Sequence, residues 1–172
     1  DLAHRGEPDA YTLLRTILRD LKIPVHLGIG NHDDRAEFCR QFPDTPTDPS
    51  GFVQYSVEIS DRVFIMLDSM ADGGSSGVLG PDRLNWLSDA LHTRPHCDTF
   101  VFLHHAPVAL GIPDLDDIGL RDAAAFGDIV DKARCVKHVF FGHVHRPVSG
   151  SWRGIPFSTQ RSLVNQSALN FR

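Results

Sequence analysis

The chain has 172 residues, enough to bury the core of one domain, and its 41% hydrophobic and 23% charged content is ordinary for a globular protein. The formal net charge of −5 argues against a nucleic-acid polymer as partner, because phosphate backbones bind to basic surfaces. No apolar run approaches the length of a bilayer span, so we expect no membrane partner.

The amino-terminal part of the chain predicts a helix, a strand and a second helix. Apolar residues recur at helical spacing over residues 8–21, where a proline opens the first turn. Residues 23–29 form an apolar run that is typical of a short buried strand. After a Gly-Asn-His-Asp turn, residues 34–41 predict a short second helix.

The middle of the chain predicts a β-hairpin followed by a long loop. Residues 52–59 alternate apolar and polar side chains, as a half-buried strand does. A tight turn at 60–61 leads into the more apolar run 62–67, so the two strands should pair antiparallel. Residues 68–80 are polar and glycine-rich, and a loop of this length is usually functional or mobile.

The second half of the chain alternates helices and strands. A third helix opens at Pro81, and residues 121–133 predict a fourth. The predicted strands and the long loop of this half are the strand 99–103, the loop 111–120, the strand 136–141, and three short strands at 148–152, 155–158 and 163–171. This order predicts an α/β fold with a mixed sheet or two packed sheets and with the helices outside.

The chain is rich in histidine and poor in cysteine. Its three cysteines are widely spaced and form no CxxC pair, which argues against a disulfide scaffold and against a thiolate zinc site. Sparse cysteines also favour a reducing cytoplasm. Ten histidines without a matching excess of cysteine favour metal ligation by imidazole and carboxylate groups.

Three of the predicted strands end in side chains that bind metals. These ends are Gly30-Asn31-His32-Asp33 after residues 23–29, His104-His105 after 99–103, and Gly142-His143-Val144-His145 after 136–141. Ligands in open α/β sheets usually lie at the carboxyl ends of the strands. We therefore expect the three strand ends to form one metal site.

Each of these groups also has a plainer explanation. His143 and His145 would share one face of an extended segment, yet two histidines in a surface loop are common. Asn31 would be a weak carbonyl ligand with His32 beside it as a proton donor, or else simply the cap of the following helix. His104 comes straight off its strand and is the better ligand.

The other two residues of interest are harder to interpret alone. His105 would support His104 or face the substrate, and the pair could also simply cap a strand. Asp1 is a lone carboxylate at a chain end and by itself carries no information.

In combination, these motifs resemble the calcineurin-like metallophosphoesterase superfamily. GNHD, then HHxP, then GHxH follow one another in the order of that family, and Asp1-Leu2-Ala3-His4 resembles its GDL segment from the aspartate onward. The forms GNHDDR and HHxP resemble one branch, the class III cyclic nucleotide and glycerophosphodiester phosphodiesterases. The resemblance covers nearly the whole chain.

The resemblance implies a fold and a set of roles. The fold would be a β-sandwich of two mixed sheets flanked by helices, with its first strand missing, in a single domain over residues 1–172 that is incomplete at the N-terminus. Two metals would be bound. The implied ligands are Asp1 as the bridging carboxylate, Asn31, His104 and His143 on one metal, and His145 on the other; His32 would act at the leaving group. His4 stands where many relatives have aspartate or asparagine.

The implied function is metal-dependent hydrolysis of small phosphodiesters, either 3′,5′-cyclic nucleotides or glycerophosphodiesters, by attack of a metal-bridging hydroxide. The alternatives are a phosphomonoesterase or nucleotidase of the same superfamily, and a non-catalytic fragment without a complete two-metal site. The cofactors would be two transition-metal ions (Fe, Mn, Zn or Co), of which we expect this chain to retain one. An uncovered sheet edge predicts a homo-oligomer. Substrate-binding residues are not predicted, because the loops 68–80 and 111–120 carry no diagnostic motif.

Overall fold

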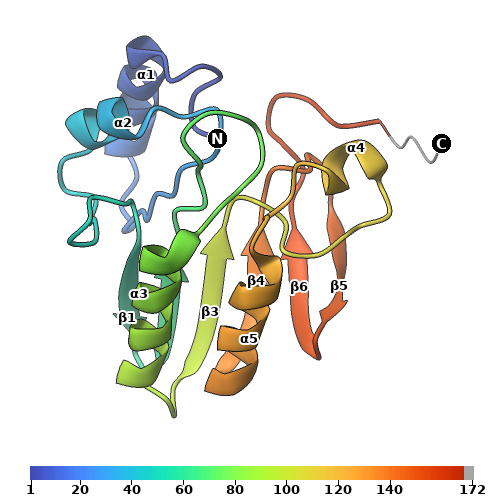
Figure 1. The fold of residues 1–172 in the computed structure, drawn as a ribbon. Coiled ribbons are helices and arrows are strands. Elements are labelled where there is room, and N and C mark those ends of the chain that lie inside the picture. The colour runs from blue at the N-terminus through green and yellow to red at the C-terminus, as the bar shows by residue number, and fades with distance from the viewer. Residues whose placement is uncertain (169–172) are drawn as a thin grey trace.

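The computed structural model describes residues 1–168 and is built on one six-stranded mixed sheet, in the order β1-β2-β3-β4-β6-β5 (Figure 1). Strands β2, β3, β4 and β6 run parallel, while β1 and β5 pair antiparallel with β2 and β6. The strands are β1 (Tyr55–Ile59), β2 (Arg62–Met66), β3 (Asp98–Leu103), β4 (Val136–Phe141), β5 (Val148–Trp152) and β6 (Ile155–Thr159). The helices are α1 (Pro8–Arg19), α2 (Arg35–Gln41), α3 (Gly80–Thr93), α4 (Pro113–Asp116) and α5 (Ala123–Ala133).

One face of the sheet is covered by α3 and α5, which connect the parallel strands (Figure 1). Alternate residues of the strands point to opposite faces, so alternate side chains of β2 and β3 are buried beneath these helices, together with Val136, Val139 and Phe141 of β4. Val101 and Val139 of the sheet share this core with Leu87 of α3 and Phe126 of α5. The burial fixes the register of the strands, because a slip of one residue would turn the apolar side chains of a strand away from the core.

The opposite face of the sheet carries a row of half-buried aromatic rings. Phe64 stacks on Phe100 with ring centroids 5.3 Å apart, and Phe102 stacks on Phe140 at 4.7 Å. The imidazole of His138 extends the row beyond Phe140 at 4.2 Å. Cross-strand aromatic pairs of this kind stabilise a sheet.

A second, smaller core lies beside the sheet and supports the amino-terminal segment. Tyr11 of α1 and Phe38 of α2 are fully buried in it with Ile29 and Val53. In Figure 1, α1 and α2 lie together above β1, next to the N-terminus. This core holds the segment that follows α1 against the strand ends.

Most predicted elements are confirmed, and the exceptions are two predicted strands and one predicted loop. Residues 23–29 are not a strand: Ile23 is 69% exposed and Val25 40%, and the segment joins no ladder in residues 1–168. An apolar run becomes a strand only where another strand offers backbone partners. Residues 163–168 are likewise irregular, and 169–171 lie outside the described residues. The predicted loop 111–120 contains the short helix α4.

The α/β class with a mixed sheet and flanking helices is confirmed, but residues 1–168 form one sheet where the family resemblance implied two. None of the helices in residues 1–168 has both the length and the hydrophobicity that a transmembrane span requires.

Candidate metal centre

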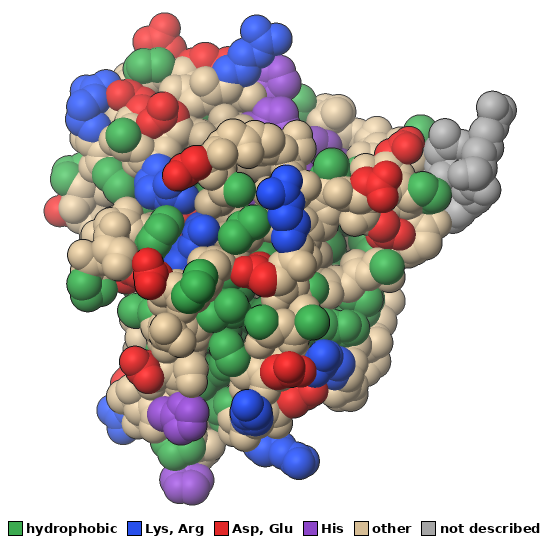
Figure 2. All heavy atoms as spheres, viewed as in Figure 1, with side chains coloured by type: hydrophobic (Ala, Val, Ile, Leu, Met, Phe, Trp, Pro, Cys, Tyr) green, Lys and Arg blue, Asp and Glu red, His purple; other side chains and the backbone are tan. Residues whose placement is uncertain are grey.

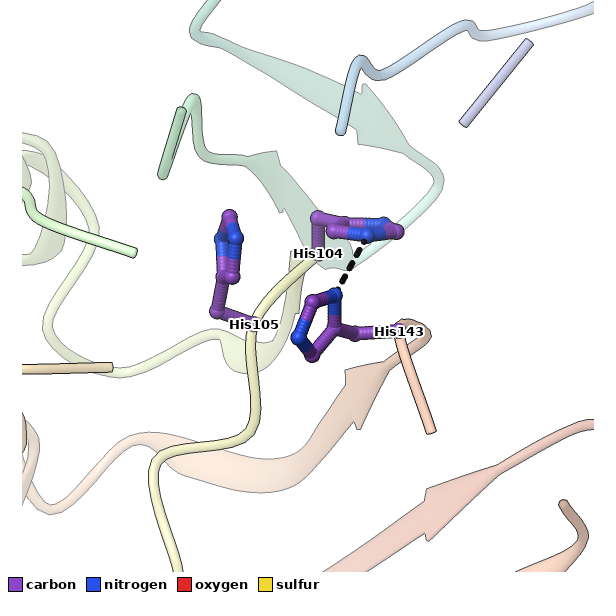
Figure 3. Close-up of side chains that lie close together, drawn as sticks. All are labelled: His104, His105 and His143. Atoms are coloured by element: carbon purple, nitrogen blue, oxygen red, sulfur yellow. Dashed lines mark hydrogen bonds between the residues drawn. The ribbon is translucent and has the colours of Figure 1, made fainter. Parts of the chain in front are cut away.

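Two parallel strands bring two histidines to the same edge of the sheet. Leu103 and Phe141, the last residues of β3 and β4, are register partners, so His104 and His143 follow side by side. The backbone continues the pairing, because the Gly142 amide donates to the His104 carbonyl at 3.0 Å. Figure 3 shows the ring of His143 turned toward His104. The predicted convergence of these two strand ends is therefore confirmed.

Four side chains meet at this edge with their ligand atoms facing one another. His104 Nε2 lies 3.1 Å from both Asn31 Oδ1 and His143 Nδ1, and the latter two atoms are 2.9 Å apart. Asp1 Oδ2 lies 3.3 Å from His104 Nε2. Ligand atoms about 2.0–2.2 Å from one ion in a tetrahedral shell lie roughly 3.3–3.6 Å from each other, so the cluster is only slightly tighter than such a shell.

The protonation of the cluster also suits a metal ion. The His104 side chain is 8% exposed, and burial holds the pKa of its imidazole well below the ordinary value. Burial, with the nearby His104 and His145, lowers the pKa of His143 to about 3. Both rings are therefore neutral near pH 7, the form in which imidazole binds metals. Facing lone pairs of this kind gain a common partner when a cation lies between them.

A glycine allows the backbone to approach the cluster. A Cβ atom at Gly30 would collide with the Asp1 carboxylate and with the imidazole of His104. The segment after β4 is constrained too, since His143 and His145 adopt φ angles of 66° and 51°, in the left-handed region. His145 is half-buried and forms no side-chain hydrogen bond with the four clustered side chains.

The Gly-Asn-His-Asp turn is held by its own acidic residues. The helix cap is Asp34, whose carboxylate accepts from the Glu37 amide at 2.8 Å, so the capping explanation of Asn31 is wrong. The buried Asp33 carboxylate accepts from the amides of Leu2, Ala3 and Gly30 and from the Tyr11 hydroxyl. Asp33 thereby fastens the segment that carries Asp1 to the turn that carries Asn31, a role that the sequence did not indicate.

His32 lies at the exposed rim of the centre. Its backbone amide donates to Asp1 Oδ1 at 3.0 Å, and its ring stacks on that of His4 at 5.2 Å. His32 Nδ1 lies 2.7 Å from the His4 carbonyl oxygen. Because a carbonyl only accepts, Nδ1 carries the proton and Nε2 is left facing away from this bond.

His105 is buried behind the cluster, and both of its ring nitrogens form hydrogen bonds with neighbouring residues. Its Nδ1 lies 2.8 Å from the Ser69 hydroxyl, and its Nε2 donates to the Ser75 carbonyl at 3.2 Å. One of its nitrogens lies within 4.8 Å of one nitrogen each of His104 and His143, but both of its own nitrogens are hydrogen-bonded, so it supports the cluster and does not join it. The packing leaves no room beside it, since a Cβ at Gly77 would collide with the ring. Ser69 and Ser75 were not predicted from the sequence.

The fold and this donor set define a metal-binding α/β protein, and comparisons with known proteins identify its family. The profile of the calcineurin-like phosphoesterase family matches residues 1–147. The chain is 39% identical over 173 residues to a probable cyclic nucleotide phosphodiesterase of Rhodopseudomonas palustris, covering 99% of this chain and 63% of the relative. It is 30% identical over 174 residues to a probable glycerophosphodiester phosphodiesterase of Arcobacter nitrofigilis, covering 100% and 64%.

A solved structure shares the fold. A dimetal phosphatase from Danio rerio matches with a TM-score of 0.69 at 16% identity, over 89% of this chain and 66% of that chain. The chain belongs to the calcineurin-like phosphoesterase family, as its motifs predicted. It spans somewhat less than two thirds of the length of the two relatives. Membership of this family implies the use of divalent metal ions.

The buried neutral histidines predict that the metal-free protein loses stability in acid. Burial lowers the pKa of His105 to about 2, against about 6.5 in the unfolded chain. Between these values the unfolded state binds more protons, so the contribution is intact above pH 6.5 and is lost as the pH falls. We expect urea unfolding in the presence of a chelator to show a falling free energy from pH 7 to pH 4. Each such histidine contributes a slope of about 1.4 kcal/mol per pH unit.

The variant His105→Gln should flatten this pH dependence, because Gln does not titrate. The matched control is His96→Gln, at an exposed position, which should leave the slope unchanged. Equal slopes for the wild-type protein and His105→Gln would contradict the assignment of a neutral buried imidazole at His105.

Proposed function

We propose that this chain carries the reaction centre of a metal-dependent phosphodiesterase that acts on small phosphodiesters. The observation that carries the proposal is the meeting of Asn31, His104, His143 and Asp1 within 3.3 Å contacts at the strand ends. The names of the relatives favour 3′,5′-cyclic nucleotides as substrates, with glycerophosphodiesters second.

Asn31, His104, His143 and Asp1 are the residues that would hold a divalent ion. A set of imidazole nitrogens and amide and carboxylate oxygens suits zinc, iron, manganese or cobalt. A bound ion supplies a Lewis acid for the phosphate oxygens and lowers the pKa of water. His145, on the same loop as His143, would serve a second ion. The family implies divalent metals, whereas the identity of the ions and the retention of one ion by this chain are part of the proposal.

His32 is placed to act as the general acid at the leaving oxygen. Its Nδ1 donates to the His4 carbonyl, so Nε2 is the ring nitrogen that would give a proton to the leaving oxygen. The ring is exposed beside Asp1, where a substrate has access to it. As the general acid, His32 would give a proton from Nε2 to the departing alkoxide.

Replacement of His32 tests this role. His32→Ala should lower the turnover of bis(p-nitrophenyl) phosphate by about 10²–10⁴-fold, the usual contribution of a general acid, while the metal content stays the same. The measurement is steady-state kinetics with added Mn²⁺, accompanied by metal analysis of both proteins. His4→Ala is the matched control, since His4 contacts Nδ1 through its backbone carbonyl and should retain most of the activity.

Three outcomes would contradict the proposal. A loss of metal in His32→Ala that matches the loss of rate would make His32 a ligand. Faster hydrolysis of p-nitrophenyl phosphate than of the diester would point to a phosphomonoesterase. Absence of both activities in a metal-loaded chain would point to a non-catalytic segment.

We further propose that the protein is cytoplasmic and forms a homo-oligomer. All three cysteines are free thiols, as in a reducing compartment. The half-buried aromatic row of Phe64, Phe100, Phe102 and Phe140 supports self-association, since extended apolar surfaces usually mark interfaces.

Light scattering coupled to size-exclusion chromatography tests the proposed oligomeric state. We expect a mass above that of one chain, and Phe102→Ser, in the middle of the aromatic row, should shift the mass toward the monomer. Leu13→Ser is the control, because Leu13 is 62% exposed on α1, away from the row. A wild-type chain that stays monomeric at high concentration would contradict this proposal.

A further inference from the structure

A pocket of about 430 Å³ begins at Asn31 and runs along the start of α2 to the loop 70–74. One wall is formed by the acidic turn and Arg35, and the other by Met70, Ala71, Asp72 and the two glycines that follow. Its volume lies within the range of pockets that hold small organic ligands, about 300–1,000 Å³. Acidic and basic side chains are interspersed on the molecular face shown in Figure 2.

Arg35 is held rigidly at this pocket by a buried carboxylate. Its Nε and Nη2 donate to the two oxygens of Asp68 at 2.7 and 3.1 Å, and Nη2 also donates to the Met70 carbonyl. Asp68 is fully buried, and the Arg35 guanidinium lies 5.0 Å from the ring centre of Phe52. A bidentate pair of this kind fixes the orientation of the guanidinium.

The third nitrogen of the Arg35 guanidinium, Nη1, is not used by Asp68 or Met70. Within residues 1–168, Nη1 makes no hydrogen bond, and its carboxylate neighbour is Asp72 Oδ1 at 3.6 Å. Asp72 is 97% exposed, so this pair is screened by water and weak.

The local charge balance leaves the Nη1 edge of Arg35 available for a ligand. Arg83 also lies against Asp68, at 3.6 Å, so two guanidiniums share one buried carboxylate. Arg83 directs its donors to backbone carbonyls of Asp68, Met70 and Leu79 and does not line the pocket. The Nη1 edge of Arg35 therefore faces the pocket, with the exposed Asp72 as its counter-charge.

We propose that this pocket binds the nucleoside part of the substrate, with Arg35 Nη1 as the recognition donor and Asp72 as the group that the ligand displaces. The inference rests on the proposed function, because Asn31 joins the pocket to the candidate metal centre. A phosphate held at Asn31 leaves its substituent beside Arg35. Ribose hydroxyls and base nitrogens accept from a guanidinium, whereas the acidic lining from Asp33, Asp34 and Asp72 disfavours a second anionic group.

An NMR titration of the ¹⁵N-labelled chain separates the two proposals. Adenosine, which has no phosphate, is added to the chelator-treated protein, and inorganic phosphate is added separately to the protein titrated with diamagnetic Zn²⁺. We expect adenosine to shift the amide signals of Asp72, Gly73 and Gly74 and the Nε–H signal of Arg35. Phosphate should instead broaden or shift the signals around Asn31 and His143.

Two variants test the recognition residue. Arg35→Lys removes Nη1 and should weaken adenosine binding about tenfold, as loss of one charge-assisted hydrogen bond does. Asp72→Asn removes the competing carboxylate and should strengthen binding about two- to fivefold. Arg83→Lys is the matched control, because it disturbs the same buried carboxylate outside the pocket, and it should leave adenosine affinity unchanged. Thermal unfolding of each variant verifies that the fold is retained.

The outcomes are distinct. Adenosine that leaves the signals of the loop 70–74 unchanged overturns this inference, even if phosphate binds at the metal centre. Equal weakening by Arg35→Lys and Arg83→Lys overturns it as well, since the effect would then come from Asp68. Failure of phosphate to perturb the metal centre contradicts the proposed function, while the adenosine titration still tests the pocket.

Discussion

The buried carboxylate of Asp33 is the interaction on which the candidate centre depends. It accepts hydrogen bonds from Gly30, from the amides of Leu2 and Ala3 and from the Tyr11 hydroxyl. These donors come from the turn, from the amino-terminal segment and from α1, so the Asp33 carboxylate joins three parts of the chain. Hydrogen bonds to a charged group contribute about 1.5–3 kcal/mol each, and a buried carboxylate without them would be strongly unfavourable. Asp1 owes its place beside His104 to this anchor.

The sheet supplies the other half of the centre and sets its chemistry. Parallel pairing of β3 and β4 places His104 beside His143, and burial at the strand ends keeps their imidazoles neutral. The same desolvation that prepares these rings to bind a cation makes their protonation costly. The free energy of unfolding therefore falls in acid, whereas near neutral pH the neutral imidazoles are ready to bind a metal. His105, hydrogen-bonded to Ser69, holds the loop 68–80 against the rear of this cluster.

The sequence predicted what local patterns determine and missed what distant partners determine. The prediction of the strands that deliver His104 and His143 was correct, because their apolar runs pair with each other inside the sheet. Residues 23–29 have the same local pattern but no backbone partner in the described residues, so the pattern alone misled. The anchoring of Asp33 by Leu2 and Ala3, and the pairing of Arg35 with Asp68, join residues 30 or more positions apart. No spacing rule reveals such contacts in advance.

The most direct measurement is anomalous diffraction from crystals of the chain grown with Mn²⁺, recorded on both sides of the manganese edge. We expect a peak about 2.0–2.3 Å from Asn31 Oδ1, His104 Nε2, His143 Nδ1 and the Asp1 carboxylate. The Asp33 hydrogen bonds and the Ser69–His105 contact should be unchanged. A manganese peak that is ligated by His105, or no peak among these four side chains at saturating Mn²⁺, would contradict the account.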